Sequence, residues 1–177
     1  LQAQREKKRL RYTLFGILAT VVLCAFIIYD GFFDVKEARY ASIIKVNSWM
    51  KGFDKISAEK ASFLRYHYVF YKKGRFSKYP YAVEARDGYG KLTSDHDMST
   101  YLVNHADLSD ESADADIMDK LGTVVRWELL QDNTGEFCIQ EKAFDKDGNV
   151  IYCYNNTRTD DPHKFVSTYV DELGFPI

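Results

Sequence analysis

The sequence predicts an α+β protein in which one transmembrane helix precedes a domain of antiparallel β-meanders with short helices. Two observations predict this class: an uncharged apolar stretch at residues 12–29, and a series of aromatic segments after residue 62 that alternate with Asp- and Gly-containing turns. With 177 residues, of which 46% are hydrophobic, the chain is long enough for one ordinary domain and an appendage. The predicted division is a basic stub (1–11), the transmembrane helix (12–29), a juxtamembrane helical segment (30–62), a first meander unit (63–108), a connecting helix (109–122) and a second meander unit (123–177).

The uncharged segment is long enough to cross a bilayer. As a helix, residues 12–29 would extend about 27 Å, close to the thickness of the hydrocarbon core. Tyr12 and Tyr29 stand at its two ends, where amphipathic rings favour the membrane interface. A buried core helix is the alternative, although uncharged runs of this length are rare in cores. Because no small-x-small cleavage site follows the segment, we expect a retained signal anchor rather than a removed signal peptide.

The flanking charges predict the orientation of this anchor. Residues 1–11 have a local charge of +4, against −6 for the remainder of the chain. The basic side chains are Arg5, Lys7, Lys8, Arg9 and Arg11. The positive-inside bias therefore places the N-terminus in the cytoplasm and the C-terminal domain outside it. Because the chain begins with Leu1 rather than Met, we expect it to be a part of a longer protein.

Residues 34–51 are predicted to form a helix that leaves the membrane. Apolar and small residues recur at helical spacing along one face, with Asp34 as the N-cap and Gly52 as the stop. That face consists of Val35, Ala38, Ser42, Val46 and Trp49. A helix lying on the bilayer surface is the alternative.

The rest of the chain alternates strand and turn patterns. Strands are predicted at 63–71, 81–85, 91–94, 124–130, 136–144 and 149–155, with a further apolar stretch at 165–170. The acidic segment 109–122 has the apolar spacing of a short helix. Asp87–Gly90 and Asp145–Gly148 are predicted to be tight turns.

The two groups of strands are similar in sequence. Residues 65–76 align without a gap on 126–137, and the two Asp-x-x-Gly turns follow at comparable places. The interpretation is an internal duplication, in which each unit comprises a short helix and a three-stranded meander. The alternative is that two meanders share turn chemistry by chance.

The stretch Phe144–Tyr152, with its Phe-Asp-x-x-Gly-Asn-aliphatic pattern, resembles the YD (RHS-type) repeats of bacterial surface proteins. Residues 86–92 match this pattern more loosely, with Arg86 in the aromatic place. The resemblance implies a structural, surface-exposed β-hairpin module and not a catalyst. Two copies are too few to enclose a cavity as long RHS arrays do, so that function is not implied.

The sequence contains few motifs that indicate catalysis or the binding of a cofactor or metal. It contains no serine-elbow motif, phosphate loop or zinc-binding motif, so we predict no catalytic residue, cofactor or metal and no enzyme. His96, His105 and the acidic residues at 107–119 fit solvated segments better than a metal site. Cys138 and Cys153 flank one turn as predicted diagonal neighbours, and either a disulfide or two thiols fits this arrangement.

These observations favour a recognition role. A net charge of −2 argues against general nucleic-acid binding. The aromatic strand pair around Tyr66, Tyr68 and Trp127 is the candidate binding surface for a protein or glycan, and the lipid bilayer is the other predicted partner. The predicted function is a single-pass, membrane-anchored extracytoplasmic sensing or interaction domain of a larger bacterial envelope or signalling protein. The alternative is a bitopic structural subunit of a secretion or envelope assembly.

Overall fold

The structure is a computed structural model that describes residues 2–46, 49–96, 122–134, 137–160 and 165–170. It divides into two compact units. The first comprises residues 1–36 together with 73–77, and the second comprises residues 37–72 together with 78–177.

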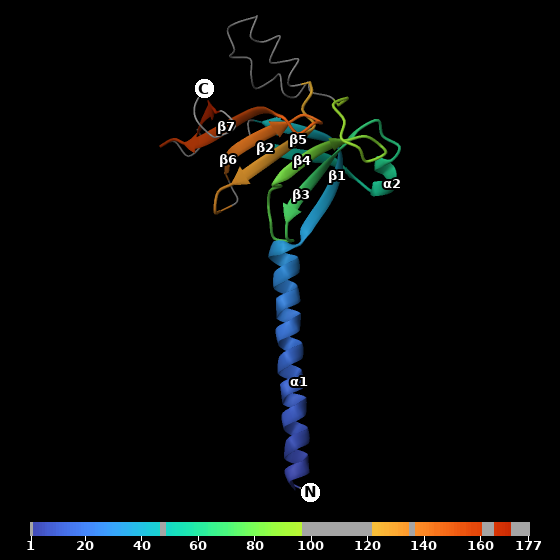
Figure 1. Cartoon of the computed structure of the whole chain (residues 1–177), viewed down its shortest axis with the longest axis vertical. Helices are drawn as coiled ribbons and strands as arrows, with labels where there is room; N and C mark the ends of the chain where they lie inside the picture. The colour runs from blue at the N-terminus through green and yellow to red at the C-terminus, as the bar shows by residue number, and fades with distance from the viewer. Residues whose placement is uncertain (1, 47–48, 97–121, 135–136, 161–164, 171–177) are drawn as a thin grey trace, which may run out of the picture. The chain divides into compact units, whose positions relative to one another are not determined.

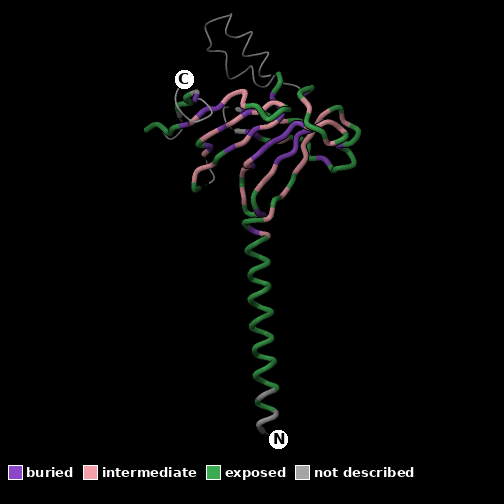
Figure 2. Tube along the Cα trace, in the orientation of Figure 1, coloured by how far each residue is buried: buried purple, intermediate pink, exposed green. Residues whose placement is uncertain are grey.

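A long helix dominates the first unit. Helix α1 (Gln2–Ile28) continues into one π-helical turn, η1 (Tyr29–Phe33) (Figure 1). The segment Lys8–Phe33 is long and apolar enough to cross a membrane, and its residues from Lys8 to Tyr29 are exposed (Figure 2). The predicted N-terminal apolar helix is therefore confirmed. It is longer than predicted, because the basic residues before Tyr12 are good helix formers and extend it toward the N-terminus.

The second unit contains one curved antiparallel sheet. Among the described residues its strand order is β2-β1-β3-β4-β5-β6-β7-β8. The strands are β1 (Val35–Val46), β2 (Trp49–Ile56), β3 (His67–Lys73), β4 (Ala82–Arg86), β5 (Arg126–Gln131), β6 (Cys138–Phe144), β7 (Val150–Arg158) and β8 (Phe165–Tyr169). A short helix, α2 (Ala58–Ala61), follows β2, and the Ser57 side chain accepts a hydrogen bond from the Lys60 amide as its N-cap.

The predicted helix at 34–51 is wrong, because this segment contains β1 and the first three residues of β2. The two strands pair antiparallel, with Tyr40 opposite Lys55 and Lys45 opposite Met50. The segment is rich in β-branched residues, so strand propensity and helical spacing were both compatible with it. Contacts distant in sequence decide between them, since Tyr40 and Ile43 pack against the core of the sheet.

The core lies on one face of the sheet and is rich in aromatic rings. Its buried members include Met50, Tyr68, Phe70, Trp127 and Leu129. The sheet must curl strongly, because the Lys45 side chain on β1 reaches Glu141 on β6, although β3, β4 and β5 lie between those strands in the sheet. Figure 2 shows the buried residues gathered in the central strands.

The strand predictions are confirmed in most places and corrected in two. Strand β3 begins at His67 rather than at residue 63, because residues 62–65 form turns after α2. The predicted strand at 91–94 is reduced to one bridge between Leu92 and Arg86. The predicted helix at 109–122 lies outside the described residues except for Gly122, which is in a turn.

The two predicted Asp-x-x-Gly turns have the same hydrogen bonds. The amide of Gly90 donates to the Asp87 carbonyl at 3.0 Å, and the amide of Gly148 donates to the Asp145 carbonyl at 3.2 Å. Both glycines have a positive φ, 82° and 86°, which glycine adopts without strain. Asp-x-x-Gly residues form such turns in any hairpin, so the shared geometry does not test the internal duplication. The duplication stays a prediction.

Candidate functional site

A pocket of about 300 Å³ lies on the face of the sheet opposite the aromatic core. Along β3, His67, Val69 and Tyr71 line this pocket, whereas the alternate residues Tyr68 and Phe70 belong to the core. The remaining walls come from the start of β1, from α2 and from the turn that follows β4. The pocket therefore forms where α2 and a turn cover part of the outer face of β3 and β4.

His67 is the distinctive residue of this pocket. It is 3% exposed, and its Nδ1 atom has no hydrogen-bond partner among the described residues. Burial lowers the pKa of His67, and the charges of Arg39 and Arg86 lower it further. The imidazole is therefore neutral at neutral pH, although the charge of Asp87 acts against that of the two arginines.

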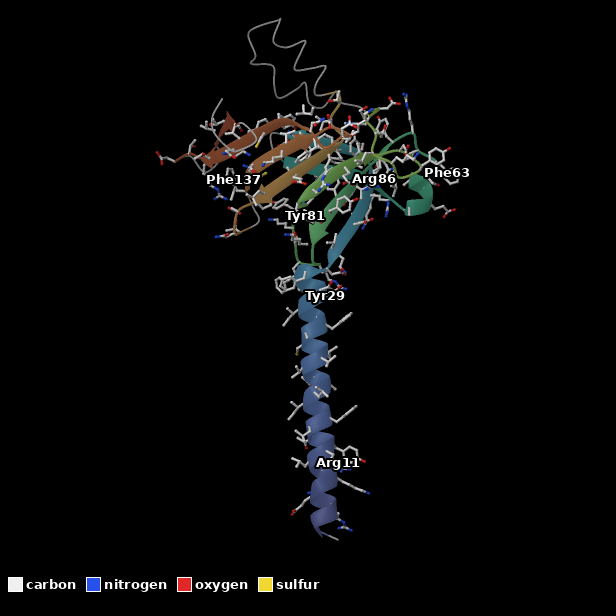
Figure 3. All side chains as sticks on the ribbon, viewed as in Figure 1. Arg11, Tyr29, Phe63, Tyr81, Arg86 and Phe137 are labelled. Atoms are coloured by element: carbon white, nitrogen blue, oxygen red, sulfur yellow. The ribbon has the colours of Figure 1, made fainter. Side chains whose placement is uncertain are left out.

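A carboxylate beneath the pocket fixes one of the two arginines. Arg86, opposite His67 in the β3–β4 register, donates from Nε to Glu84 Oε2 at 2.8 Å. Tyr71 also donates its hydroxyl proton to Glu84 Oε2 at 2.8 Å. Burial and this bond to Glu84 raise the pKa of Tyr71 to about 12, so the phenol stays protonated and continues to donate. Arg86, which Figure 3 labels, is thus held by hydrogen bonds to Glu84 and Tyr71.

The second arginine is about as exposed as Arg86 but has fewer hydrogen bonds within the described part of the chain. Arg39 Nη2 lies 3.0 Å from Glu37 Oε2, and the Arg39 side chain is 33% exposed. An ion pair between such exposed groups contributes little free energy, so a ligand can compete for this guanidinium. At the rim, the Tyr89 ring is 94% exposed and offers an apolar face to whatever enters the pocket.

The predicted binding surface at Tyr66, Tyr68 and Trp127 is corrected by the structure. The three residues lie together, since the Tyr66 and Tyr68 ring centroids are 6.1 Å apart and His96 stacks edge-on against Trp127. However, Tyr68 is 2% exposed and Trp127 is fully buried, so these two residues belong to the core, and the half-buried Tyr66 packs against it. The period-2 alternation of β3 allowed either face to be the inner one, and tertiary packing placed the larger aromatic side chains inside.

His96 also has a structural role in this cluster. Its Nε2 lies 2.7 Å from the Val124 carbonyl oxygen, which can only accept, so Nε2 carries the proton. Its Nδ1 then accepts from the Tyr68 hydroxyl at 3.2 Å. His105 and the acidic residues at 107–119 lie outside the described residues. Within the described part of the chain, no three His, Cys, Asp or Glu residues gather as a metal site would require.

The predicted proximity of Cys138 and Cys153 is also corrected. A register shift between Ala143 and Phe144 places Cys153 opposite Lys142. Lys142 lies four residues along β6 from Cys138, a distance of about 13 Å, which no disulfide can bridge. Both cysteines are accordingly buried thiols. An irregularity of this kind in the hairpin leaves no clear signal in the sequence.

Sequence reasoning missed a buried ion pair inside the curled sheet. Lys45 Nζ lies 2.8 Å from Glu141 Oε1, and the side chains are 3% and 0% exposed. Tyr152 donates to the same Glu141 oxygen at 2.7 Å, and Trp127 Nε1 donates to the Tyr152 hydroxyl at 3.2 Å. In the sequence, Lys45 and Glu141 are charged residues in two distant segments. Nothing in that pattern indicates that they would pair with each other or be buried.

The basic residues that predict orientation lie on α1, and Arg5, Lys8, Arg9 and Arg11 are exposed there. Figure 3 marks Arg11 near one end of the apolar segment and Tyr29 at the other. Comparisons with protein families, with curated proteins and with solved structures find no significant match for the chain.

Proposed function

We propose that this chain is a membrane-anchored sensing domain that binds a small anionic molecule outside the cytoplasm, in the pocket beside His67. One observation carries the proposal. A buried imidazole nitrogen that has no hydrogen-bond partner in the described part of the chain lies next to two guanidinium groups in a pocket of about 300 Å³. Leaving a buried polar atom unpaired costs free energy, so this atom requires an explanation, and a ligand that accepts or donates a hydrogen bond there would provide one.

The chemistry of the pocket favours a carboxylate. Arginine recognises carboxylates through its planar fork, and the neutral imidazole can donate a hydrogen bond from Nδ1. The pocket suits a monoanion better than a highly charged phosphate, because Arg86 is already engaged by Glu84 and only the weaker pair of Arg39 with Glu37 is open to competition. The volume lies at the lower end of the range for small-molecule sites. The exposed Tyr89 ring at the rim suits a ligand that carries an apolar group beside its carboxylate.

Membrane anchoring is supported by the apolar helix and its basic flank. The segment Lys8–Phe33 is long enough to span a bilayer, and its large apolar side chains are exposed. The excess of basic residues before Tyr12 favours a cytoplasmic N-terminus, and therefore an extracytoplasmic pocket.

The covalent connection between the pocket and the helix supports a sensing role rather than simple capture. Strands β3 and β4 contribute His67 and Arg86 to the pocket, and the loop that joins these strands hydrogen-bonds to the end of the helix. The Gly74 amide donates to the Asp34 carbonyl at 2.6 Å, and the Phe76 amide donates to the Gly31 carbonyl at 3.2 Å. A ligand that shifts this hairpin would therefore act on residues bonded to the anchor.

The test measures binding of benzoate to the full chain in lipid nanodiscs by isothermal titration calorimetry. Benzamide, which has the same shape without the charge, is the comparison ligand. We expect benzoate to bind and benzamide to bind at least tenfold more weakly. Arg39→Gln should weaken benzoate binding by about 10- to 100-fold, because a charge-assisted hydrogen bond contributes about 1.5–3 kcal/mol.

The matched control is Arg158→Gln, because Arg158 is also an exposed arginine with one carboxylate partner, Asp132 at 2.9 Å, and it does not line the pocket. This variant should bind benzoate as the wild type does. Equal affinities for benzoate and benzamide, or equal effects of the two arginine substitutions, would contradict the proposal.

A further inference from the structure

Four exposed aromatic rings gather in the first unit, at the end of the apolar helix. Tyr29, Phe32 and Phe33 come from the last turn of the helix, and Phe76 comes from the loop between β3 and β4. Their exposed fractions lie between 59% and 66%. Soluble surfaces rarely expose several large aromatic side chains side by side, so this group requires an explanation.

Phe76 is held in the group by specific contacts although it lies far from the helix in the sequence. Its ring centroid is 5.5 Å from that of Phe32. A side chain at Gly31 would have its Cβ 2.5 Å from the Phe76 ring, so the ring lies directly on the backbone of the helix end. The absence of a side chain at Gly31 is what allows this packing.

The loop backbone is fixed to the same turn. The amides of Gly74, Arg75 and Phe76 donate to the carbonyls of Asp34, Asp30 and Gly31, at 2.6, 3.1 and 3.2 Å respectively. A Cβ at Gly74 would lie 2.0 Å from the Gly31 oxygen, so only glycine permits this approach. Three consecutive backbone hydrogen bonds make the loop a continuation of the helix end rather than a mobile connection.

Charged groups lie immediately beside the aromatic rings. Arg75 Nη2 is 3.1 Å from Asp30 Oδ2, and Lys36 Nζ is 2.6 Å from Asp34 Oδ2. The Arg75 side chain remains 72% exposed. Aromatic rings next to exposed cations form the amphipathic pattern that favours the headgroup region of a bilayer.

We infer that residues 73–77 form a second membrane-contacting element, in which Phe76 lies in the lipid interface together with Tyr29, Phe32 and Phe33. The partner of this surface is the lipid bilayer, because the surface is continuous with the apolar helix itself. The inference rests on the proposed anchoring, and it adds that the β3–β4 loop, and not the helix alone, contacts lipid. The loop would then define the depth of the anchor and limit rotation of the helix end.

The test is 19F NMR of the full chain in nanodiscs, with 4-fluorophenylalanine introduced at position 76, 26 or 63. Each sample is measured with a nitroxide-labelled lipid, and then with a water-soluble gadolinium chelate. Phe26 lies within the apolar helix and is the lipid reference. Phe63 is the solvent reference, because it is 82% exposed and lies in the loop after α2, outside the first unit. Fluorine replaces one ring hydrogen, so folding is preserved.

We expect the signals at 26 and 76 to broaden with the labelled lipid, and the signal at 63 to broaden with the chelate. A signal at 76 that behaves as the one at 63, while 26 still responds to lipid, would overturn the inference and leave the anchoring intact. A signal at 26 that responds to the chelate instead would overturn the anchoring, and the inference with it.

Discussion

His67 is the single residue on which the pocket most depends, and its titration can be measured. Its pKa is lowered in the folded chain by burial and by the nearby arginines, so the unfolded chain binds the proton at a higher pH. The free energy of unfolding must then fall as the pH falls below the unfolded value of about 6.5. We expect His67→Gln, which cannot titrate, to show a shallower loss of stability between pH 7 and pH 5.

This comparison is made by thermal unfolding of the full chain in nanodiscs over that pH range. Other histidines contribute equally to both proteins, so the difference between the two curves isolates His67. Parallel curves would mean that His67 has the same proton affinity in the folded and unfolded chains. Addition of benzoate should also raise the unfolding temperature of the wild type more than that of His67→Gln.

The buried pair of Lys45 and Glu141 predicts a large effect of a single substitution. Lys45→Met removes one charge and leaves the other fully buried, which destabilises proteins by about 3–5 kcal/mol. The double variant Lys45→Met with Glu141→Leu removes both charges and should recover most of this loss, because an apolar pair of similar volume is often neutral.

The free energy of unfolding of both variants is measured by pulse proteolysis in urea. A double variant no more stable than Lys45→Met would show that the hydrogen bond from Tyr152 to Glu141, rather than the charge pair, carries the stability. A stable single variant would show that water reaches the Glu141 carboxylate. Neither residue lines the pocket, so benzoate binding by the folded fraction should be unchanged.

At the scale of an element, the β6–β7 turn shows how local chemistry fixes a hairpin. Asp145 Oδ1 accepts from the amides of Asp147 and Asn149, at 2.9 and 2.8 Å, and Gly148 provides the positive φ. The hydrogen bonds from Asn149 and from the turn amides lower the pKa of Asp145, so the carboxylate stays ionised and continues to accept. These signals lie within five residues, which explains why the turn could be predicted.

Gly148→Ala should therefore destabilise the hairpin by about 1 kcal/mol, because alanine is strained at positive φ although no atom obstructs its Cβ. Gly148→Asn is the matched variant, since asparagine tolerates this conformation better and should cost less. The measurement is the free energy of unfolding of each variant. An asparagine variant less stable than the alanine variant would contradict the role assigned to backbone conformation.

Other elements show where local reasoning fails. Residues 34–51 combine helical spacing with β-branched residues, so the sequence alone did not distinguish the two structures. Pairing of β1 with β2, and packing of Tyr40 against Phe70 with centroids 4.9 Å apart, selected the strand. The pocket is equally non-local, because its walls come from strands and turns up to about fifty residues apart.

At the scale of the whole molecule, the basic flank of α1 determines a testable orientation. Replacing Arg5, Lys7, Lys8, Arg9 and Arg11 by glutamine removes the charge bias. We expect a mixed population in which part of the C-terminal domain is retained in the cytoplasm. Protease accessibility of a C-terminal tag in intact cells measures this fraction. Complete external exposure of the tag in the variant would show that the flank does not set the topology.

The alternative function, a bitopic structural subunit, predicts a different dependence on the helix. If residues 12–29 are replaced by an alternating Leu-Ala segment of equal length, a sensing domain should still bind benzoate in the membrane. A structural subunit would lose its assembly, because its helix would contact partners through particular side chains. If the variant binds benzoate and cross-linking detects the same complexes as in the wild type, the sensing function is favoured. If cross-linking shows that a native complex is lost, the structural subunit is favoured.

The sequence by itself determined the features that depend on neighbouring residues: an apolar helix with a basic flank, the two Asp-x-x-Gly turns, and the strands β3 to β7 in outline. Only the tertiary structure decided which face of β3 is internal, how far the sheet curls, and hence that Tyr68 and Trp127 are buried while His67 lines a pocket. The physical reason is that helix length and turn geometry are local, whereas burial, strand pairing and the partners of charged groups depend on residues far apart along the chain.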